Sequence, residues 1–132
     1  MIEVESIHHV SLSVTNLEKA KHFYGVMLGF QELERPDFDF PGAWYQVGNQ
    51  QLHLIVQEGA STLRSDYTIN TKDGHFAIRV KDYEKTLKHL KSLGVEITEK
   101  PNSASGFAQL FCMDPDSNLI EFNVDQESLK NR

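Results

Sequence analysis

Three histidines and one glutamate lie in segments where polar and apolar residues alternate: His9, His53, His75 and Glu121. Imidazole nitrogen and carboxylate oxygen are suitable ligands for Zn, Ni, Fe, Co or Mn, whereas three imidazoles fit Mg or Ca poorly. A single histidine on a strand is more often a hydrogen-bonded structural residue. Four such groups buried together without an ion would leave polar groups unpaired, at several kcal/mol. The sequence therefore raises the hypothesis of one divalent transition-metal site.

Strand parity places these four residues on equivalent faces. Residues two apart in a strand share a face, and direct neighbours lie on opposite faces. In each of the four segments the apolar residues occupy one face, which we expect to pack under helices, and the candidate ligand occupies the other. The apolar sets are Val10, Leu12 and Val14; Leu52, Leu54 and Val56; Phe76, Ile78 and Val80; and Ile120, Phe122 and Val124.

The chain contains an internal repeat. HVSLSV at 9–14 aligns with HFAIRV at 75–80, and LHLIV at 52–56 aligns with IEFNV at 120–124. A duplicated unit constrains architecture more firmly than local propensity does. The repeat equates His9 with His75 and His53 with Glu121. If the two units pack with approximate two-fold symmetry, the four side chains converge.

Each half is expected to form a βαβββ unit in an α+β fold. Thr15 or Asn16 and then Asp82 begin the two helices, and Gly29 and Gly94 end them. The predicted single domain, 1–132, comprises module 1 at about 5–57, a linker at about 58–73 and module 2 at about 74–125. Strands are expected at 7–14, 30–34, 43–48 and 51–57, then at 75–81, 95–99, 107–113 and 118–124.

Composition excludes several classes of protein. A length of 132 residues suits one domain. The net charge of −6 argues against a nucleic-acid partner. No signal-like start and no long apolar run is present, so we expect no membrane association and a cytoplasmic location. The single cysteine, Cys112, cannot form an internal disulfide, and parity predicts that it is buried and unreactive.

The other histidines are interpreted as structural or surface residues. His8 falls on the apolar face of the first strand unless the register slips by one residue, and His22 and His89 lie on helices among lysines.

A loop rich in aromatic residues is a candidate substrate-binding segment. Residues 36–45 contain Phe38, Phe40, Trp44 and Tyr45, and their prolines and glycine exclude a regular element. Of these we select Phe38, Trp44 and Tyr45 as candidate substrate contacts. The alternative is that the rings fill the space between sheet and helix or lie at a dimer contact.

Arg79 is a further candidate, because it shares a face with His75 and could bind a substrate carboxylate or phosphate bidentately. A structural salt bridge to Glu121 or another acid is the alternative. Residues 102–107 are polar and either close over a ligand or form a plain hairpin connection.

These residues resemble the vicinal oxygen chelate superfamily, which includes glyoxalase I, fosfomycin-resistance enzymes, extradiol dioxygenases and bleomycin-resistance proteins. The resemblance covers nearly the whole chain and is carried by 9–14, by Phe23-Tyr24 with Leu28-Gly29-Phe30, by 74–80 and by 114–122. It implies a curled mixed sheet, shaped as a cup, that holds one metal with coordination positions open to a small oxygen-chelating substrate. It also implies a homodimer, possibly with the site shared between subunits.

Within this superfamily the resemblance favours a metal-dependent lyase or isomerase of the lactoylglutathione lyase type, with Glu121 and His53 catalytic. The sequence departs from glyoxalase I at His53, where that enzyme uses a glutamate as ligand and base. His9, His75 and Glu121 also form the two-histidine, one-carboxylate set of Fe(II) oxygenases. An extradiol-type dioxygenase, with His53 outside the ligand set, is therefore one alternative. A non-catalytic small-molecule binding or resistance protein is another.

Overall fold

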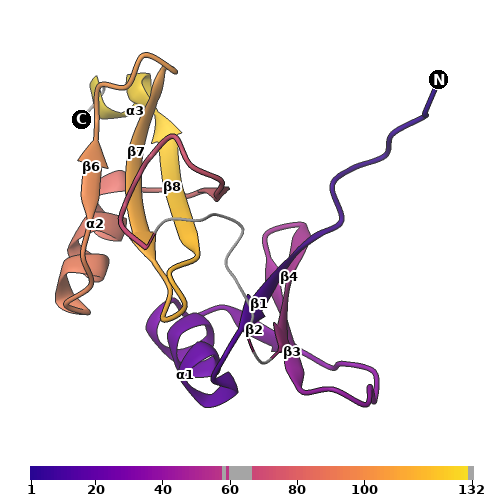
Figure 1. Ribbon diagram of the computed structural model, residues 1–132. Helices are drawn as coiled ribbons and strands as arrows, with labels where there is room; N and C mark the ends of the chain where they lie inside the picture. Colours follow the sequence, from indigo (N-terminus) through magenta and orange to yellow (C-terminus); the bar gives the residue numbers. More distant parts are fainter. Residues whose placement is uncertain (58, 60–66, 131–132) are drawn as a thin grey trace. The chain divides into compact units, whose positions relative to one another are not determined.

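The computed structural model describes residues 1–57, 59 and 67–130 (Figure 1). The chain forms two compact units, Met1–Thr62 and Leu63–Arg132, each built around its own four-stranded sheet. Much of the expected linker at 58–73 lies outside the described residues.

The first unit has the order βαβββ. Its helix continues without a break into a π-helical segment, η1. The sheet order is β1-β4-β3-β2, with β1 parallel to β4 and the other pairs antiparallel. The elements are β1 (His9–Val14), α1 (Leu17–Lys21), η1 (His22–Met27), β2 (Gln31–Leu33), β3 (Gly42–Val47) and β4 (Gln50–Val56).

The second unit repeats this topology. Its sheet order is β5-β8-β7-β6, with β5 parallel to β8 and the other pairs antiparallel. The elements are β5 (Phe76–Arg79), α2 (Tyr83–Ser92), β6 (Thr98–Lys100), β7 (Phe107–Met113), β8 (Leu119–Asp125) and α3 (Gln126–Lys130). The predicted pair of βαβββ modules with mixed sheets is confirmed, and α3 is an addition to it.

Equivalent signals begin and end the two main helices. The side chain of Asn16 accepts a hydrogen bond from the Lys19 amide, and that of Asp82 accepts one from the Lys85 amide. Each oxygen satisfies a helix N–H that has no partner within the helix. Gly29 and Gly94 follow the helices with φ of 79° and 74°, a conformation that favours glycine.

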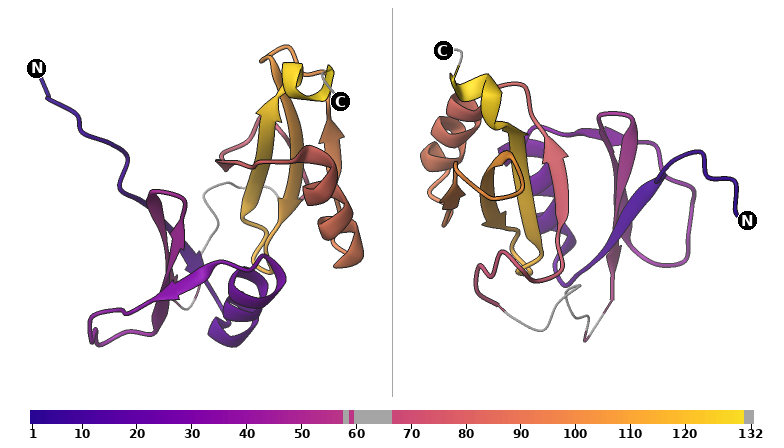
Figure 2. Two further views of the ribbon diagram at one scale, coloured as in Figure 1. Left: turned by 180° about the vertical axis from the view of Figure 1, so that it is seen from behind. Right: turned by 90° about the horizontal axis from the view of Figure 1, so that it is seen from above.

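The core of each module lies between the sheet and its helix (Figure 2). In the first module Leu12, Val14, Leu52 and Leu54 are buried, and α1 contacts β3 and β4. In the second, the buried face includes Leu110, Cys112, Ile120, Phe122 and Val124, with Tyr83, Leu87 and Leu90 of α2. The predicted parity of these strands is confirmed, so the opposite faces are left for the candidate ligands.

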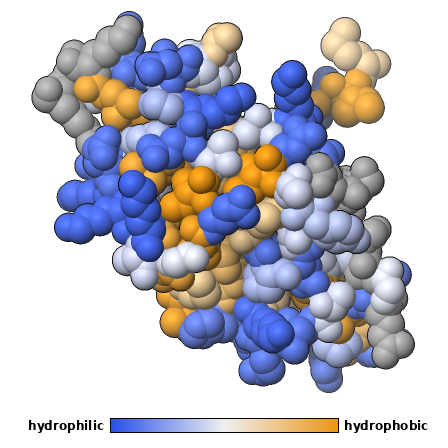
Figure 3. Space-filling view, turned by 60° about the vertical axis from the view of Figure 1, so that its left-hand side comes forward, coloured by the Kyte–Doolittle hydropathy of each residue, from blue (hydrophilic) through white to orange (hydrophobic). Residues whose placement is uncertain are grey.

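Apolar side chains are also exposed at several places. They include Met1, Ile2, Val4 and Ile7 ahead of β1, and Phe38 and Phe40 between β2 and β3. Figure 3 shows one face of the protein, on which apolar residues lie between hydrophilic ones. Among the described residues, no helix is both long and apolar enough to cross a membrane.

Candidate metal centre

His9 and His53 meet on the face of the first sheet that points away from its core. Strand β1 pairs with β4 so that Ser11 is opposite His53, which puts His9 one pleat away on the same face. The two imidazole rings stack, with centroids 4.0 Å apart and an interplanar angle of 17°. Parity and register together therefore form the first histidine pair.

His53 lies between two rings. The Trp44 ring stacks on it with centroids 4.1 Å apart, and His53 Nε2 lies 2.9 Å from Gln51 Oε1. His53 is buried, and this burial, with the nearby His9, His8 and Arg35, lowers its pKa to about 4. At neutral pH the imidazole is uncharged, which is the form that binds a metal or accepts a proton.

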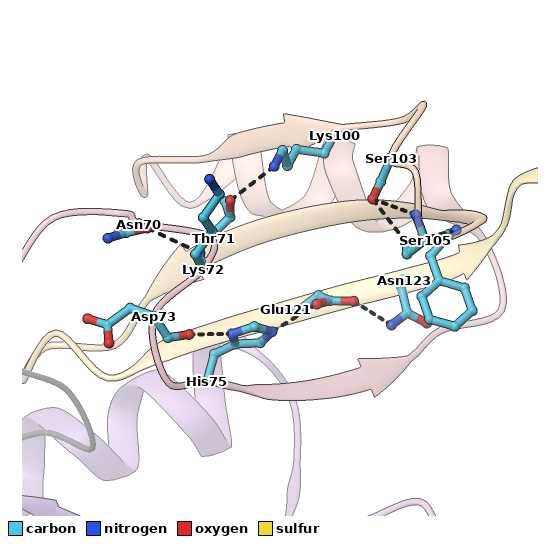
Figure 4. A network of polar contacts seen from close by, with 11 residues as sticks. Asn70, Thr71, Lys72, Asp73, His75, Lys100, Ser103, Ser105, Glu121 and Asn123 are labelled. Atoms are coloured by element: carbon cyan, nitrogen blue, oxygen red, sulfur yellow. Dashed lines mark hydrogen bonds and ion pairs between the residues drawn. The ribbon is translucent and has the colours of Figure 1, made fainter.

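His75 and Glu121 form the corresponding pair in the second module (Figure 4). His75 Nε2 lies 3.0 Å from Glu121 Oε1. Glu121 is on β8 and only 4% exposed, while His75 immediately precedes β5, one residue outside the observed strand. The ring of Phe111, which is opposite Glu121 in the sheet, contacts His75 edge to face at 5.5 Å.

Both members of this pair are held by further hydrogen bonds. His75 Nδ1 donates to the backbone carbonyl of Asp73 at 2.7 Å, and Asn123 Nδ2 donates to Glu121 Oε2 at 2.6 Å. Figure 4 shows these contacts in one line along β8. A backbone carbonyl that accepts from one ring nitrogen fixes the tautomer and orients the other nitrogen, as in many metal-binding histidines.

This pair fits a metal ion. Nδ1 of His75 donates to the Asp73 carbonyl, so Nε2 is the ring nitrogen that faces a carboxylate oxygen of Glu121. With a second proton, Nε2 donates to this oxygen, and without that proton both atoms present lone pairs. Two such acceptors at 3.0 Å are stable only with a proton or a cation between them. Two ligands bound side by side to one ion, each at about 2.0–2.2 Å, lie about 3.0–3.5 Å apart. The donor set and its spacing both suit a divalent transition metal.

The four predicted ligands are assembled as two pairs, one in each module. In the part of the chain that the structure describes, no group of three or more His, Cys, Asp or Glu side chains is gathered closely enough to hold a metal ion. A single site made by all four residues thus stays a prediction.

His8 differs from its expected position. Strand β1 begins at His9, so strand parity does not apply to His8, which is exposed instead of facing the core. Its Nδ1 lies 2.9 Å from Nδ1 of His9. His22 is exposed on η1, as expected for a surface residue.

The proposed aromatic contacts lie on both faces of the first sheet. Trp44 stacks on His53, and the Phe38 ring lies 6.2 Å from that of Trp44. Tyr45 points the other way, is only 1% exposed, and lies 6.3 Å from Tyr24 of η1. Tyr45 is therefore a core residue of the module, and Phe38 and Trp44 are the candidates on the histidine face.

Arg79 takes part in a structural network, as the alternative interpretation supposed. Its Nε donates to Asn123 Oδ1 at 2.7 Å, and its Nη1 lies 3.2 Å from Asp125 Oδ1. The guanidinium also lies over the Phe107 ring. Because Asn123 binds Glu121, Arg79 orients the residue that holds the carboxylate.

Sequence reasoning gave no role to Gln51, Asp73 or Asn123. Parity places Gln51 beside His53 and Asn123 beside Glu121, so a search for polar neighbours two residues from each ligand finds both. Asp73 contacts His75 through its backbone carbonyl. Because every residue has this group, the identity of residue 73 does not reveal the contact.

Two βαβββ modules with the same sheet order, each with a helix over one face of its sheet, define a duplicated α+β fold class. The chain belongs to the Glyoxalase/Bleomycin resistance protein/Dioxygenase superfamily, whose family model matches residues 6–122.

Individual relatives are distant. Glyoxylase I 4 of Arabidopsis thaliana is 28% identical over 123 residues, covering 91% of this chain and 71% of the relative. The lactoylglutathione lyase of Neisseria meningitidis serogroup A is 28% identical over 119 residues, covering 86% of each. A crystal structure assigned to the glyoxalase family from Bacillus anthracis superposes with a TM-score of 0.81 at 23% identity, covering 95% of this chain and 98% of that one. This last similarity shows the fold alone.

Proposed function

We propose that the chain is a divalent-metal-dependent lyase or isomerase that acts on a small substrate offering two oxygens, in the manner of a lactoylglutathione lyase. The observation that carries this proposal is the His75–Glu121 pair, in which Nε2 of an oriented imidazole lies 3.0 Å from an oxygen of a buried carboxylate. The similarity to lactoylglutathione lyases supports the reaction class.

His9, His53, His75 and Glu121 would hold one Zn, Ni, Fe, Co or Mn ion. When bound, the cation would supply Lewis-acid stabilisation of an oxyanion that develops on the substrate. Uniting the two pairs requires that both modules share the ion, within a single domain of one chain or across a homodimer. The proposal includes the homodimer as the assembly.

Glu121 and His53 are the proposed proton carriers. Glu121 is held by Asn123 through one oxygen, so the other oxygen keeps a fixed direction. Burial lowers the pKa of His53 to about 4, so its imidazole is uncharged at neutral pH and has a free lone pair for a proton, but it is a weaker base than an ordinary imidazole. The resemblance to glyoxalase I implies a glutamate at the His53 position, so the basicity of His53 is where this chain would differ from that enzyme.

The test is metal analysis of protein purified without added metal salts, followed by two activity assays. Nickel or zinc in the protein, with turnover of a methylglyoxal–thiol adduct, is the expected result. If the protein instead contains iron and cleaves the ring of catechols, the dioxygenase hypothesis would replace the lyase hypothesis. No bound metal and no metal-dependent rise in Tm would instead support a binding protein.

A further inference from the structure

The loop between β2 and β3 places a line of rings on the histidine face of the first sheet. Phe38 and Phe40 stack with centroids 5.0 Å apart, and Phe38 lies against Trp44, which stacks on His53. Phe38 and Phe40 are 42% and 37% exposed. The outer end of this line is thus an apolar surface open to solvent.

Arg35 lies against this outer end. Its guanidinium carbon is 4.7 Å from the Phe38 ring centroid and 5.0 Å from that of Phe40, and its Nη2 donates to the Phe40 carbonyl at 3.0 Å. A guanidinium that contacts aromatic rings keeps its charge and can still donate hydrogen bonds from its edge. The rings and the carbonyl therefore fix the position of the cation.

Gly42 provides the space for this arrangement. A Cβ at residue 42 would lie 2.9 Å from Arg35 Nη2 and 2.3 Å from the Leu54 carbonyl oxygen. Any side chain there would displace the guanidinium or the strand. The absence of a side chain at the start of β3 thus allows Arg35 to pack across the sheet.

The charge of Arg35 is not balanced by a carboxylate. Among the described residues no acid forms an ion pair with it, although Asp37 and Asp39 are close in sequence and the chain has a net charge of −6. Its Nε is buried without a hydrogen-bond partner. By contrast, Arg79 in the second module has both an amide and a carboxylate partner. A fixed cation with donors to spare has the properties of an anion receptor.

We propose that Arg35, Phe38 and Phe40 form a subsite for the anionic group of a small ligand, a carboxylate or a phosphonate, whose apolar body lies over the two rings. The guanidinium binds the oxyanion through the Nη N–H groups that the Phe40 carbonyl does not use, and the rings cover the adjoining carbon skeleton. This subsite is built within the first module and does not require the metal.

The test uses the full chain, freed of metal on a chelating resin. Trp44 is the only tryptophan and lies in the line of rings, so its fluorescence, excited at a wavelength specific for tryptophan, reports binding. The probes are benzoate, phenylphosphonate and the uncharged benzyl alcohol, and calorimetry checks each titration. We expect saturable binding of at least one anion, and at least about tenfold weaker binding of the alcohol.

Arg35→Gln should weaken binding of the anion by about 10- to 100-fold, because a charge-assisted hydrogen bond is lost. Lys19→Gln is the matched control: it removes one positive charge from an exposed residue of the same module and should change the affinity less than twofold. Arg35→Lys keeps the charge but loses the planar fork and should bind with intermediate affinity. Circular dichroism and Tm establish that each variant is folded.

Tighter binding of benzoate would assign the subsite to carboxylates, and tighter binding of phenylphosphonate would assign it to phosphonates. Failure of both anions to bind saturably would overturn the proposal, as would equal binding by Arg35→Gln or equal binding of benzyl alcohol. If Arg35→Gln does not fold, wild-type affinity in Arg35→Lys overturns it. Since no metal is present, the result is independent of the metal assays.

Discussion

His75 is held at both ring nitrogens, by a carbonyl on one side and a carboxylate on the other. In His75→Ala the carboxylate of Glu121 loses the imidazole that faces it, and we expect affinity for Ni²⁺ or Zn²⁺ to fall by more than about 100-fold. Substitution of a residue that only hydrogen-bonds to a metal ligand typically lowers metal affinity by about 10–100-fold, and loss of a ligand itself should cost more. Calorimetric titration of the metal into metal-free protein measures the change.

The matched control is His22→Ala, an exposed histidine on η1, which should keep wild-type affinity. Equal loss in both variants, or in neither, would show that His75 is not a ligand.

Cys112 is fully buried on the core face of β7, and burial, with the nearby Asp114, raises the pKa of its thiol to about 12. We expect negligible reaction with a thiol reagent at pH 8 in the native state and full reaction in urea. The unfolded thiol ionises at a lower pH than the folded one. This group therefore contributes less stability as pH rises above about 9, which urea unfolding at pH 8 and pH 10 would detect.

Strand parity predicted the faces of His9, His53 and Glu121, which lie within β1, β4 and β8. His75 precedes β5, and its hydrogen bonds to Asp73 and Glu121 hold it in place. Tyr45 shows a parity signal that the choice of ring contacts did not use. Trp44 and Tyr45 are neighbours within the strand expected at 43–48, and β3, which begins at Gly42, places them on opposite faces. Arg35 could not be found from the sequence, because its position depends on rings three and five residues away and on the missing side chain of Gly42.

At the scale of elements, the two helices begin with the same hydrogen bond. Asp82→Ala removes the oxygen that accepts from the Lys85 amide, and we expect a loss of about 1 kcal/mol in the free energy of unfolding. Glu84→Ala, in the exposed first turn, should lower the free energy of unfolding by only about a few tenths of a kcal/mol. Urea denaturation of the two variants measures the difference. A loss for Glu84→Ala as large as that for Asp82→Ala would contradict the capping role.

Strand β3 should tolerate no side chain at its first residue. In Gly42→Ala the new Cβ meets the Leu54 carbonyl of β4 at 2.3 Å, so we expect destabilisation by roughly 2 kcal/mol or more. Gly25→Ala in η1 is the control, since its Cβ would meet only the Tyr45 ring at ordinary contact distances. Thermal unfolding compares the two, and equal Tm values would refute the steric argument.

Most element boundaries could be predicted to within two or three residues, since the glycines, Asn16 and Asp82 mark them. The π-helical turn at 22–27 and α3 at 126–130 were not predicted. The turn at 22–27 has the apolar spacing of an ordinary helix. Only five residues form α3, and its apolar content is too low to give a periodic signal.

At the scale of the whole molecule, the proposal requires one ion to serve both modules. Excess Zn²⁺ or Ni²⁺ should raise the Tm of the wild type, by an amount equivalent to about 2.7 kcal/mol at a hundredfold excess over Kd. Either His9→Ala/His53→Ala or His75→Ala/Glu121→Ala should abolish the whole increase. If each double variant keeps about half of the metal-dependent increase in Tm, the two pairs bind separate ions. Sedimentation of the metal-bound protein tests the homodimer.

The connection between β6 and β7 is closed by the residue that follows β8. Gln126 donates through its side chain to the carbonyls of Ser103 and Phe107, and through its backbone to that of Gly106. These three hydrogen bonds hold residues 102–107 as a hairpin connection, so the segment is not free to close over a ligand. Cleavage after residue 125, or a fusion partner that unwinds α3, would deprive these three carbonyl oxygens of their hydrogen-bond donors at once. Tags for biochemical work therefore belong at the other terminus.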